Sequence, residues 1–420
     1  MLEKVSLFNA KRDFLNFFLA CGFILFYTLL MEYQNYKNFT KFDTALTNAT
    51  VLSQYTKTKE SKTYQILKLK SEDGYTFYTM KNSAFTDAVG KTLKLEITTD
   101  KVTFYNFLTS FFSYSSVLDS SYDETQKQKL NNFIAAQHES KEIASVYQAL
   151  FLAMGLEKNL QANFSVLGVS HIIAISGFHL GILSALLYLL LSKPYKILQN
   201  RYFVYRNSKV DLFLIIATLL LFYMLFLDSP DSLLRSFAML IVGFILYDRG
   251  FKIISMQTLF LTVTLLLVFS PRLLFSLGFW LSVFGVFYIF LFLIHFKHLS
   301  KIWQFFLVEF STYLLMLPLA LALFGAFGIY HPFSIILSML FILFYPLSIF
   351  LHVIGFGNLF DGLLQSLILL GETKHVVPLS MPFLALHIGI SFWAIFKKLG
   401  MWVLLVYSFG IFVYALYMLY

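Results

Sequence analysis

Charged residues are scarce in this chain. Only 13% of its 420 residues are Asp, Glu, Lys or Arg, whereas soluble domains carry about 25%. Hydrophobic residues make up 58% of the chain. Apolar runs long enough for a membrane-spanning helix, about 20 residues, recur from Leu212 to Tyr420. A soluble globular fold is therefore excluded, and the sequence predicts a polytopic α-helical membrane protein with about ten transmembrane helices.

Cysteine pairs and the common catalytic motifs are also missing. Cys21 is the only cysteine, so no disulfide can form within the chain. The sequence contains no Walker A motif, no HExxH and no CxxC pair. We therefore expect no enzymatic activity, no cofactor and no metal site. If the protein moves a cargo, the energy must come from another component.

Positive charge is in excess, since 32 Lys and Arg residues stand against 23 Asp and Glu, a net charge of +9. Two explanations stay open: the enrichment of basic residues in cytoplasmic loops, which we favour, and an anionic cargo such as nucleic acid. The loop 193–209 contains five basic residues and no acidic one. Lys4, Lys11 and Arg12 precede the first apolar run. Both segments are predicted to be cytoplasmic, in a bacterial inner membrane.

Four regions follow from the distribution of polar and apolar residues. Residues 1–32 are predicted to be a cytoplasmic N-terminus and the first transmembrane helix. Residues 33–104 are rich in β-branched and aromatic residues, with Asp73-Gly74 at a hairpin position, which predicts a small periplasmic β-domain. Residues 105–165 are predicted to form amphipathic helices at the membrane surface, and residues 166–420 a transmembrane channel domain.

The predicted β-domain is basic and aromatic. It contains eleven lysines and seven carboxylates, interleaved with tyrosine and phenylalanine. Such a surface suits single-stranded nucleic acid, whose bases stack on aromatic rings while lysines pair with phosphates. Alternatively, and with a higher prior, the aromatic residues form the core of an ordinary lysine-rich domain. The candidate DNA contacts are Lys57, Lys68, Lys70, Tyr75, Phe77 and Tyr78.

The most informative apolar run is 171–181, which carries His171, Ser176, Gly177 and His179. Polar groups at bilayer depth are costly unless they face water or protein. A Ser-Gly step also permits a helix to break, which is tolerated where the backbone lines a cavity. The alternative is an ordinary helix whose histidines lie at an interface and whose glycines allow close packing.

A second polar segment contains Asp228, Ser229, Pro230, Asp231 and Arg235. Pro230 is expected to end one helix and start the next. Arg235 falls one turn after Asp231, where an ion pair would lower the cost of burying both. This pairing explains the residues as a capped loop, but it also places a cation at the start of a membrane span.

Two further polar positions lie in apolar surroundings. Gly278 and Ser282 lie at the entrance of a later span, and Glu309 is the only carboxylate in the run 303–323. A lone membrane carboxylate is a candidate for function, although one near a helix end can also reach water.

In combination, these segments resemble the ComEC-type competence proteins, the inner-membrane channels for incoming DNA in natural transformation. The resemblance covers about residues 160–350 and rests on four motifs in order: His171 to His179, Ser229-Pro230 to Arg235, Gly278 to Ser282 after Pro271, and Leu317-Pro318. The upstream order of one anchor, a small β-domain of the OB kind and amphipathic helices is also similar. Tyr313 stands where the family has Gln, and no His-x-His-x-Asp-His metal motif of a C-terminal metallo-β-lactamase-like domain occurs.

The resemblance implies a channel that passes single-stranded DNA from the periplasm to the cytoplasm. It implies as partners a periplasmic DNA receptor, a cytoplasmic helicase or single-strand-binding proteins, and the lipid bilayer; a homo-oligomer is possible. The alternative is a secondary transporter for a small anionic solute, which also uses broken helices and midplane charges. The β-domain distinguishes the two, because a small-solute carrier has no need of it.

Overall fold

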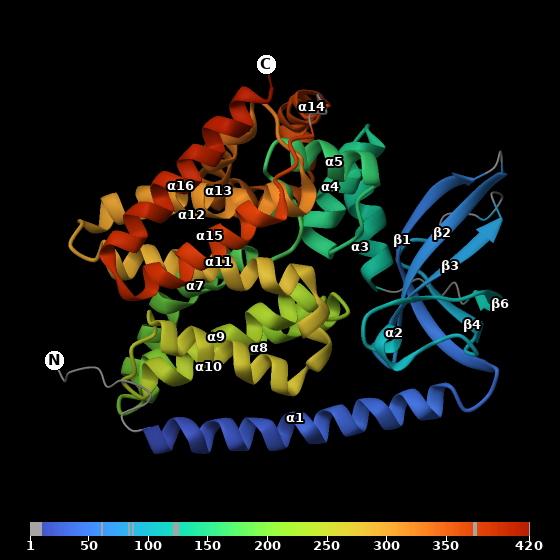
Figure 1. Cartoon of the computed structure of the whole chain (residues 1–420), viewed down its shortest axis with the longest axis horizontal. Helices are drawn as coiled ribbons and strands as arrows, with labels where there is room; N and C mark the ends of the chain where they lie inside the picture. The colour runs from blue at the N-terminus through green and yellow to red at the C-terminus, as the bar shows by residue number, and fades with distance from the viewer. Residues whose placement is uncertain are drawn as a thin grey trace.

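The computed structural model describes residues 11–59, 62–82, 85, 88–120, 126–372 and 376–419, apart from the side chains of six residues, among them Asp231. One long helix, a small sheet and a larger helical body follow one another along the chain (Figure 1). The strands are β1 (Thr44–Lys59), β2 (Lys62–Ser71), β3 (Thr76–Asn82), β4 (Thr92–Thr98), β5 (Phe111–Phe112) and β6 (Ser115–Ser120). The helices are α1 (Lys11–Phe39), α2 (Phe104–Leu108), α3 (Gln126–Ala135), α4 (Lys141–Leu152), α5 (Lys158–Val166), α6 (Ser170–Ile173), α7 (Gly177–Tyr202), α8 (Ser208–Phe226), α9 (Asp231–Asp248), α10 (Met256–Phe269), α11 (Leu277–His295), α12 (Lys301–Phe324), α13 (Ser334–Val353), α14 (Asp361–Leu370), α15 (Met381–Phe396) and α16 (Lys398–Tyr417), with short 3-10 turns η1 (Pro271–Phe275), η2 (His331–Phe333) and η3 (Gly357–Phe360).

Within the described part of the chain, seven helices are long and apolar enough to cross a membrane: α1, α7, α8, α11, α12, α13 and α16. Three shorter apolar helices lie among them, at α10, η3–α14 and α15. A helix of 14 residues, such as α10, spans only about 21 Å, less than a hydrocarbon core of about 30 Å. The predicted class, a multi-pass helical membrane protein with a small β-domain, is confirmed.

The β-domain is a six-stranded mixed sheet in the order β5-β3-β2-β1-β4-β6. Its two edge strands belong to one short segment, residues 111–120, which reaches both ends of the sheet. β5 pairs with β3 in parallel, and β6 pairs with β4 in antiparallel register. Between them, the Ser113 amide donates to the carbonyl of Tyr78 on β3, and its hydroxyl donates to the carbonyl of Thr98 on β4. The sheet is thereby closed into a small barrel of the OB kind.

The barrel is larger than the predicted range 33–104. α1 continues to Phe39, whose ring packs on Tyr75 and Phe107 inside the barrel. The chain after 104 supplies α2 and the closing strands rather than surface helices alone. The two-residue spacing of this last segment was too short and irregular to predict as a strand. The first boundary shifted because the helix extends beyond the apolar run into the domain it supports.

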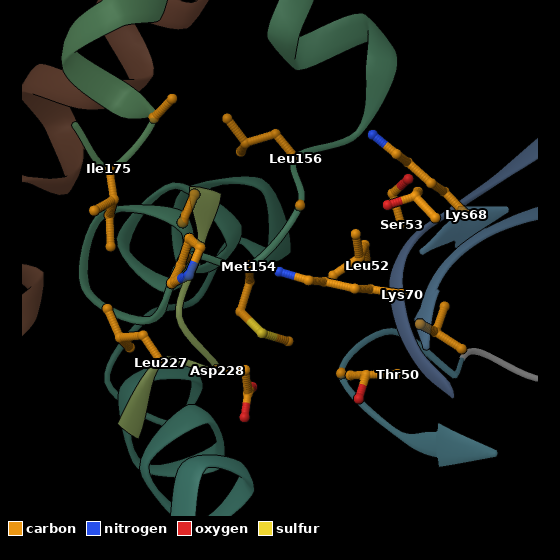
Figure 2. Close-up of a pocket in the computed structure, with 18 of the residues that line it drawn as sticks. Thr50, Leu52, Ser53, Lys68, Lys70, Met154, Leu156, Ile175, Leu227 and Asp228 are labelled. Atoms are coloured by element: carbon orange, nitrogen blue, oxygen red, sulfur yellow. The ribbon is translucent and has the colours of Figure 1, made fainter. Parts of the chain in front are cut away.

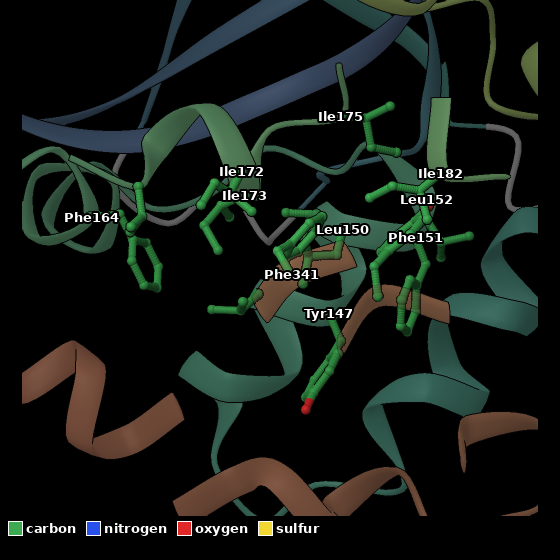
Figure 3. Packing of buried hydrophobic residues seen from close by; sticks show 14 of the residues in the cluster. Tyr147, Leu150, Phe151, Leu152, Phe164, Ile172, Ile173, Ile175, Ile182 and Phe341 are labelled. Carbon is green, nitrogen blue, oxygen red and sulfur yellow. The ribbon is translucent and has the colours of Figure 1, made fainter. Parts of the chain in front are cut away.

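α4 is also more deeply buried than a helix at a membrane surface would be. Eight of its twelve residues are buried, so it packs on all sides instead of presenting one face. Tyr147, Leu150 and Phe151 pack in one core with α6, α7 and α13 (Figure 3). α4 is therefore part of the helical body and connects it to the β-domain that precedes it.

An ion pair fixes α1 and the barrel to the membrane spans. The guanidinium of Arg272, in η1, donates two hydrogen bonds to the carboxylate of Glu32, of 3.0 and 2.8 Å. The same guanidinium lies over the ring of Phe107, 5.1 Å from its centre. This bidentate geometry defines the angle at which α1 leaves the helical body and carries the β-domain.

Candidate functional site

A cavity of about 990 Å³ lies between the β-domain and the helical body. Its walls come from four parts of the chain that are distant in sequence (Figure 2). β1, β2 and β3 form one wall, and the opposite wall consists of the end of α4, the start of α5, residues 173–175 and the loop 227–232. The backbone approaches closely beside it, because a Cβ on Gly155 would lie 2.5 Å from the Leu52 carbonyl oxygen. Gly155 therefore permits the contact that defines one edge of the cavity.

The sheet wall is basic and aromatic because of strand alternation. Leu67 and Leu69 of β2 point into the barrel core, so Lys68 and Lys70 point outward. Lys70 extends into the cavity toward Met154 (Figure 2). Tyr78 is the cross-strand partner of Lys68, whose ammonium lies 6.0 Å from the tyrosine ring centre. Burial raises the pKa of the Tyr78 hydroxyl, which stays neutral and can donate a hydrogen bond.

The helical wall adds two more lysines. Lys158, at the start of α5, places its ammonium 3.4 Å from the centre of the Tyr55 ring. Lys127 of α3 forms an ion pair of 2.6 Å with Asp228, whose side chain is 62% exposed. Among the residues that line the cavity, four are lysines and two, Glu72 and Asp228, are carboxylates. The cavity thus favours an anionic ligand that also has rings to stack.

One wall contains an interrupted helix. α6 ends at Ile173, and α7 begins at Gly177, with Ala174 and Ser176 in extended conformation between them. The Ser176 hydroxyl accepts from the amide of Phe178, and Nδ1 of His179 accepts from the amide of Ser176. This capping box satisfies amides at the start of α7. The break therefore leaves backbone groups facing the cavity at low cost.

The loop before α9 stabilises that break. The Ser232 hydroxyl donates to the carbonyl of Ile175, over 2.7 Å. Asp228 and Ser229 both have left-handed backbones, with φ of 61° and 49°. Such conformations cost about 1–3 kcal/mol each for residues other than glycine. The loop is thus held in a strained shape that brings Asp228 and Ser232 to the two sides of the cavity.

The structure brings half of the predicted site residues to this cavity. Ser176 and Gly177 flank it directly, since residues 173–175 line it. Asp228, Ser229 and Pro230 line it on the helical side, and Lys68, Lys70 and Tyr78 line it on the sheet side. These segments lie more than 100 residues apart, and their proximity is a result of the fold.

The other predicted positions lie elsewhere. Tyr75 and Phe77 are buried in the barrel core, so they cannot stack on bases, and that prediction was wrong for them. Lys57 is exposed on β1 outside the cavity, and Gly278, Ser282 and Glu309 do not line it. His179 is fully buried as a helix cap, and His171 contacts Ser338 through Nε2 at 3.4 Å. Arg235 is buried with its guanidinium over Phe279, and the side chain of its predicted partner Asp231 lies outside the described residues.

Several cavity residues had no signal in the sequence. Tyr55, Lys127 and Lys158 belong to a β-strand and two short helices that carry no recognisable motif. Only the contact between the barrel and α4–α5 places them together. No cluster of three or more His, Cys, Asp or Glu residues suited to a metal occurs in the part of the chain that the structure describes.

Comparison with known families identifies the helical body. A family model described as competence protein matches residues 153–419. The chain belongs to the competence protein family. The matched region of this competence protein contains the helix break, the loop 227–232 and Lys158, whereas the β-domain and most of α4 precede it. No curated protein and no solved structure matches the chain.

The close contact between α7 and α9 gives a stability prediction. A Cβ at Gly177 would lie 2.8 Å from Oγ and 3.3 Å from Cβ of Ser236. We expect Gly177→Ala to lower the free energy of unfolding by about 1–3 kcal/mol, as overpacking does. Ser236→Ala in the same chain should recover part of that loss. The measurement is thermal unfolding of the purified protein in detergent.

Gly181 provides the matched control, because nothing lies within 4 Å of a Cβ built there. Gly181→Ala should be neutral or slightly stabilising, as expected for alanine in a helix. If Gly177→Ala and Gly181→Ala unfold at the same temperature, the packing of the break against α9 is not tight.

Proposed function

We propose that this membrane protein passes single-stranded DNA across the cytoplasmic membrane and that the strand first binds in the basic cavity between the β-domain and the interrupted helix. The observation that carries the proposal is the meeting of four lysines and two half-buried tyrosines with a broken helix at one cavity. Membership of the competence protein family supports the same substrate.

The chemistry of the cavity suits the proposed cargo. Each nucleotide brings one negative charge and one flat base, and hydrocarbon excludes the charge. Lys68, Lys70 and Lys158 can neutralise phosphates, while Tyr55 and Tyr78 offer rings at the same wall. The break at residues 174–176 leads from that wall into the helical body, where backbone groups can replace water.

A small anionic solute is the other candidate cargo. Its carrier would need a site enclosed by membrane helices, whereas here strands β1–β3 form one wall of the cavity. We therefore favour the polymer over the small solute.

The proposed setting is a bacterial inner membrane, with the N-terminus in the cytoplasm and the β-domain in the periplasm. A periplasmic receptor would deliver the strand to the β-domain, and a cytoplasmic helicase or single-strand-binding protein would draw it inward. Arg206 and the other basic residues of the loop 193–209 are on the proposed cytoplasmic side.

DNA binding by the full-length protein tests the proposed cargo. We expect Lys68→Gln together with Lys70→Gln to weaken binding of a fluorescent single-stranded oligonucleotide, measured by polarisation in nanodiscs. The slope of log K against log salt should become shallower by about 0.7 for each phosphate that no longer pairs with a lysine. Lys57→Gln, a change of equal charge on an exposed residue outside the cavity, should have little effect. Equal weakening by both changes would mean that general charge, and not the cavity, binds DNA.

Reporter fusions test the proposed orientation. A reporter that is active only in the periplasm should be silent when fused after Arg201 and active when inserted near Lys81. The reason is that Arg201 lies in the acid-free loop 193–209 and Lys81 lies on β3 of the β-domain. The reverse pattern would overturn the orientation without affecting the DNA-binding test.

A further inference from the structure

A buried chain of hydrogen bonds connects the turn before α4 to the ends of α13 and α14. His138 lies in that turn, and its side chain is fully buried. Its Nδ1 lies 2.9 and 3.0 Å from the two carboxylate oxygens of Asp361 at the start of α14. Its Nε2 lies 3.0 Å from Nε2 of His352 at the end of α13. Nδ1 of His352 in turn lies 2.7 Å from the carbonyl oxygen of Ser348.

This chain needs three hydrogens. The Ser348 carbonyl can only accept, so Nδ1 of His352 carries a hydrogen, and a neutral His352 then has a lone pair at Nε2. An ionised Asp361 can also only accept, so Nδ1 of His138 carries a hydrogen, and a neutral His138 likewise has a lone pair at Nε2. Two lone pairs would then face each other across 3.0 Å. One additional proton removes this repulsion, whether it resides on an imidazole or on Asp361.

A metal ion is the other species that two facing imidazole nitrogens could hold. With metal–nitrogen bonds of about 2.0–2.1 Å and tetrahedral angles, the two nitrogens would lie about 3.3–3.4 Å apart. The observed 3.0 Å matches a hydrogen bond. No group of three metal-ligating side chains occurs among the residues that the structure describes. The distance and the ligand number therefore favour a proton.

We propose that Asp361, His138 and His352 form a proton-binding latch that holds α4 against α13 and α14 and releases it as the pH rises. Neighbouring contacts make the latch specific to this turn. The Gln137 amide donates to the His352 carbonyl over 3.1 Å and accepts from the Gly357 amide over 2.9 Å. Tyr147 of α4 stacks on His138, with ring centres 4.6 Å apart.

The latch is connected to the cavity by α4. Tyr147 contacts the latch, and Ala149, Ala153 and Met154, at and just beyond the other end of the helix, line the cavity. Loss of the proton would free the first end of α4 and change the position of that wall. This consequence for cargo entry rests on the proposed function, whereas proton binding itself does not.

Few other titratable groups face the latch. Tyr147 is the group on α4, and burial raises the pKa of its hydroxyl, so it stays neutral over the relevant range. Glu139, Lys141 and Glu142 follow His138 along the chain and are exposed to solvent. α13 contributes His352, and α14 contributes Asp361. The titration near neutral pH is therefore assigned to the two histidines and Asp361 together.

The sign of the pH dependence follows from proton counting. Unfolded histidine loses its proton near pH 6.5, while the folded latch retains one proton to higher pH. The folded protein then binds more protons than the unfolded chain, and its stability falls as the pH rises above about 6.5.

Asp361→Asn separates the latch from a merely structural network. The Asn amide can donate to Nδ1 of His138, whose Nε2 then carries the hydrogen and donates to His352. All three hydrogen bonds persist with neutral imidazoles, so no additional proton is required. We expect wild-type protein in detergent to lose stability relative to Asp361→Asn between pH 6.5 and 9, with a slope of up to one proton. His298→Gln, which removes an exposed histidine, should follow the wild type.

Two outcomes would overturn the latch. One is a difference in stability between wild type and Asp361→Asn that is constant across this pH range. The other is a loss of wild-type stability on adding EDTA, which would assign a metal to the two histidines. Neither result depends on DNA, so failure here is distinguishable from failure of the proposed function.

Spin labels measure the release of α4 directly. In a Cys21→Ser background, labels replacing Glu142 and Ser366 report the distance between the exposed faces of α4 and α14. We expect this distance distribution to broaden from pH 6 to pH 9 in the otherwise wild-type chain and to stay narrow with Asp361→Asn. Equal distributions at both pH values in both proteins would show that the cluster does not move α4.

Discussion

The interruption between α6 and α7 is the feature on which the cavity depends. A continuous helix would hydrogen-bond every backbone group internally and leave a closed apolar wall. Here the chain leaves the helix at Ala174 and resumes at Gly177, and each freed group finds a partner: Ser176 caps α7, His179 completes the box, and Ser232 binds the Ile175 carbonyl. The loop before α9 adopts its left-handed residues to reach this position.

The sheet completes what the break begins. The helical body alone would present an open notch at residues 173–176, with the loop 227–232 beside it. The barrel covers this notch, and its approach is fixed by Arg272 and Glu32 at one side and by Gly155 against Leu52 at the other. The family match begins at Ala153 and therefore contains the break but not the sheet. The basic and aromatic wall of the cavity is supplied by the part of the chain that lies before the match.

Sequence reasoning found the elements whose physics is local. The apolar runs predicted the membrane class, and the Ser176-Gly177 step predicted a break because it combines a capping side chain with a residue that has no Cβ. Alternation along β2 was sufficient to identify Lys68 and Lys70. It was not sufficient for Tyr75 and Phe77, because the barrel closes and turns both rings inward. Tyr55, Lys127 and Lys158 meet only through tertiary contacts, and the burial of α4 depends on helices that follow it by about 200 residues.

The central claim is that incoming single-stranded DNA passes through the cavity between the sheet and the helix break. Site-specific photo-crosslinking during DNA uptake tests it most directly, with a photoreactive amino acid at Tyr55 on the sheet wall, at Ser229 on the helical wall, or at exposed Lys57 outside the cavity. In cells that still take up DNA, the account predicts crosslinks to the transforming strand from Tyr55 and Ser229 and none from Lys57. Crosslinks from Lys57 alone, or none from either cavity wall, would contradict it.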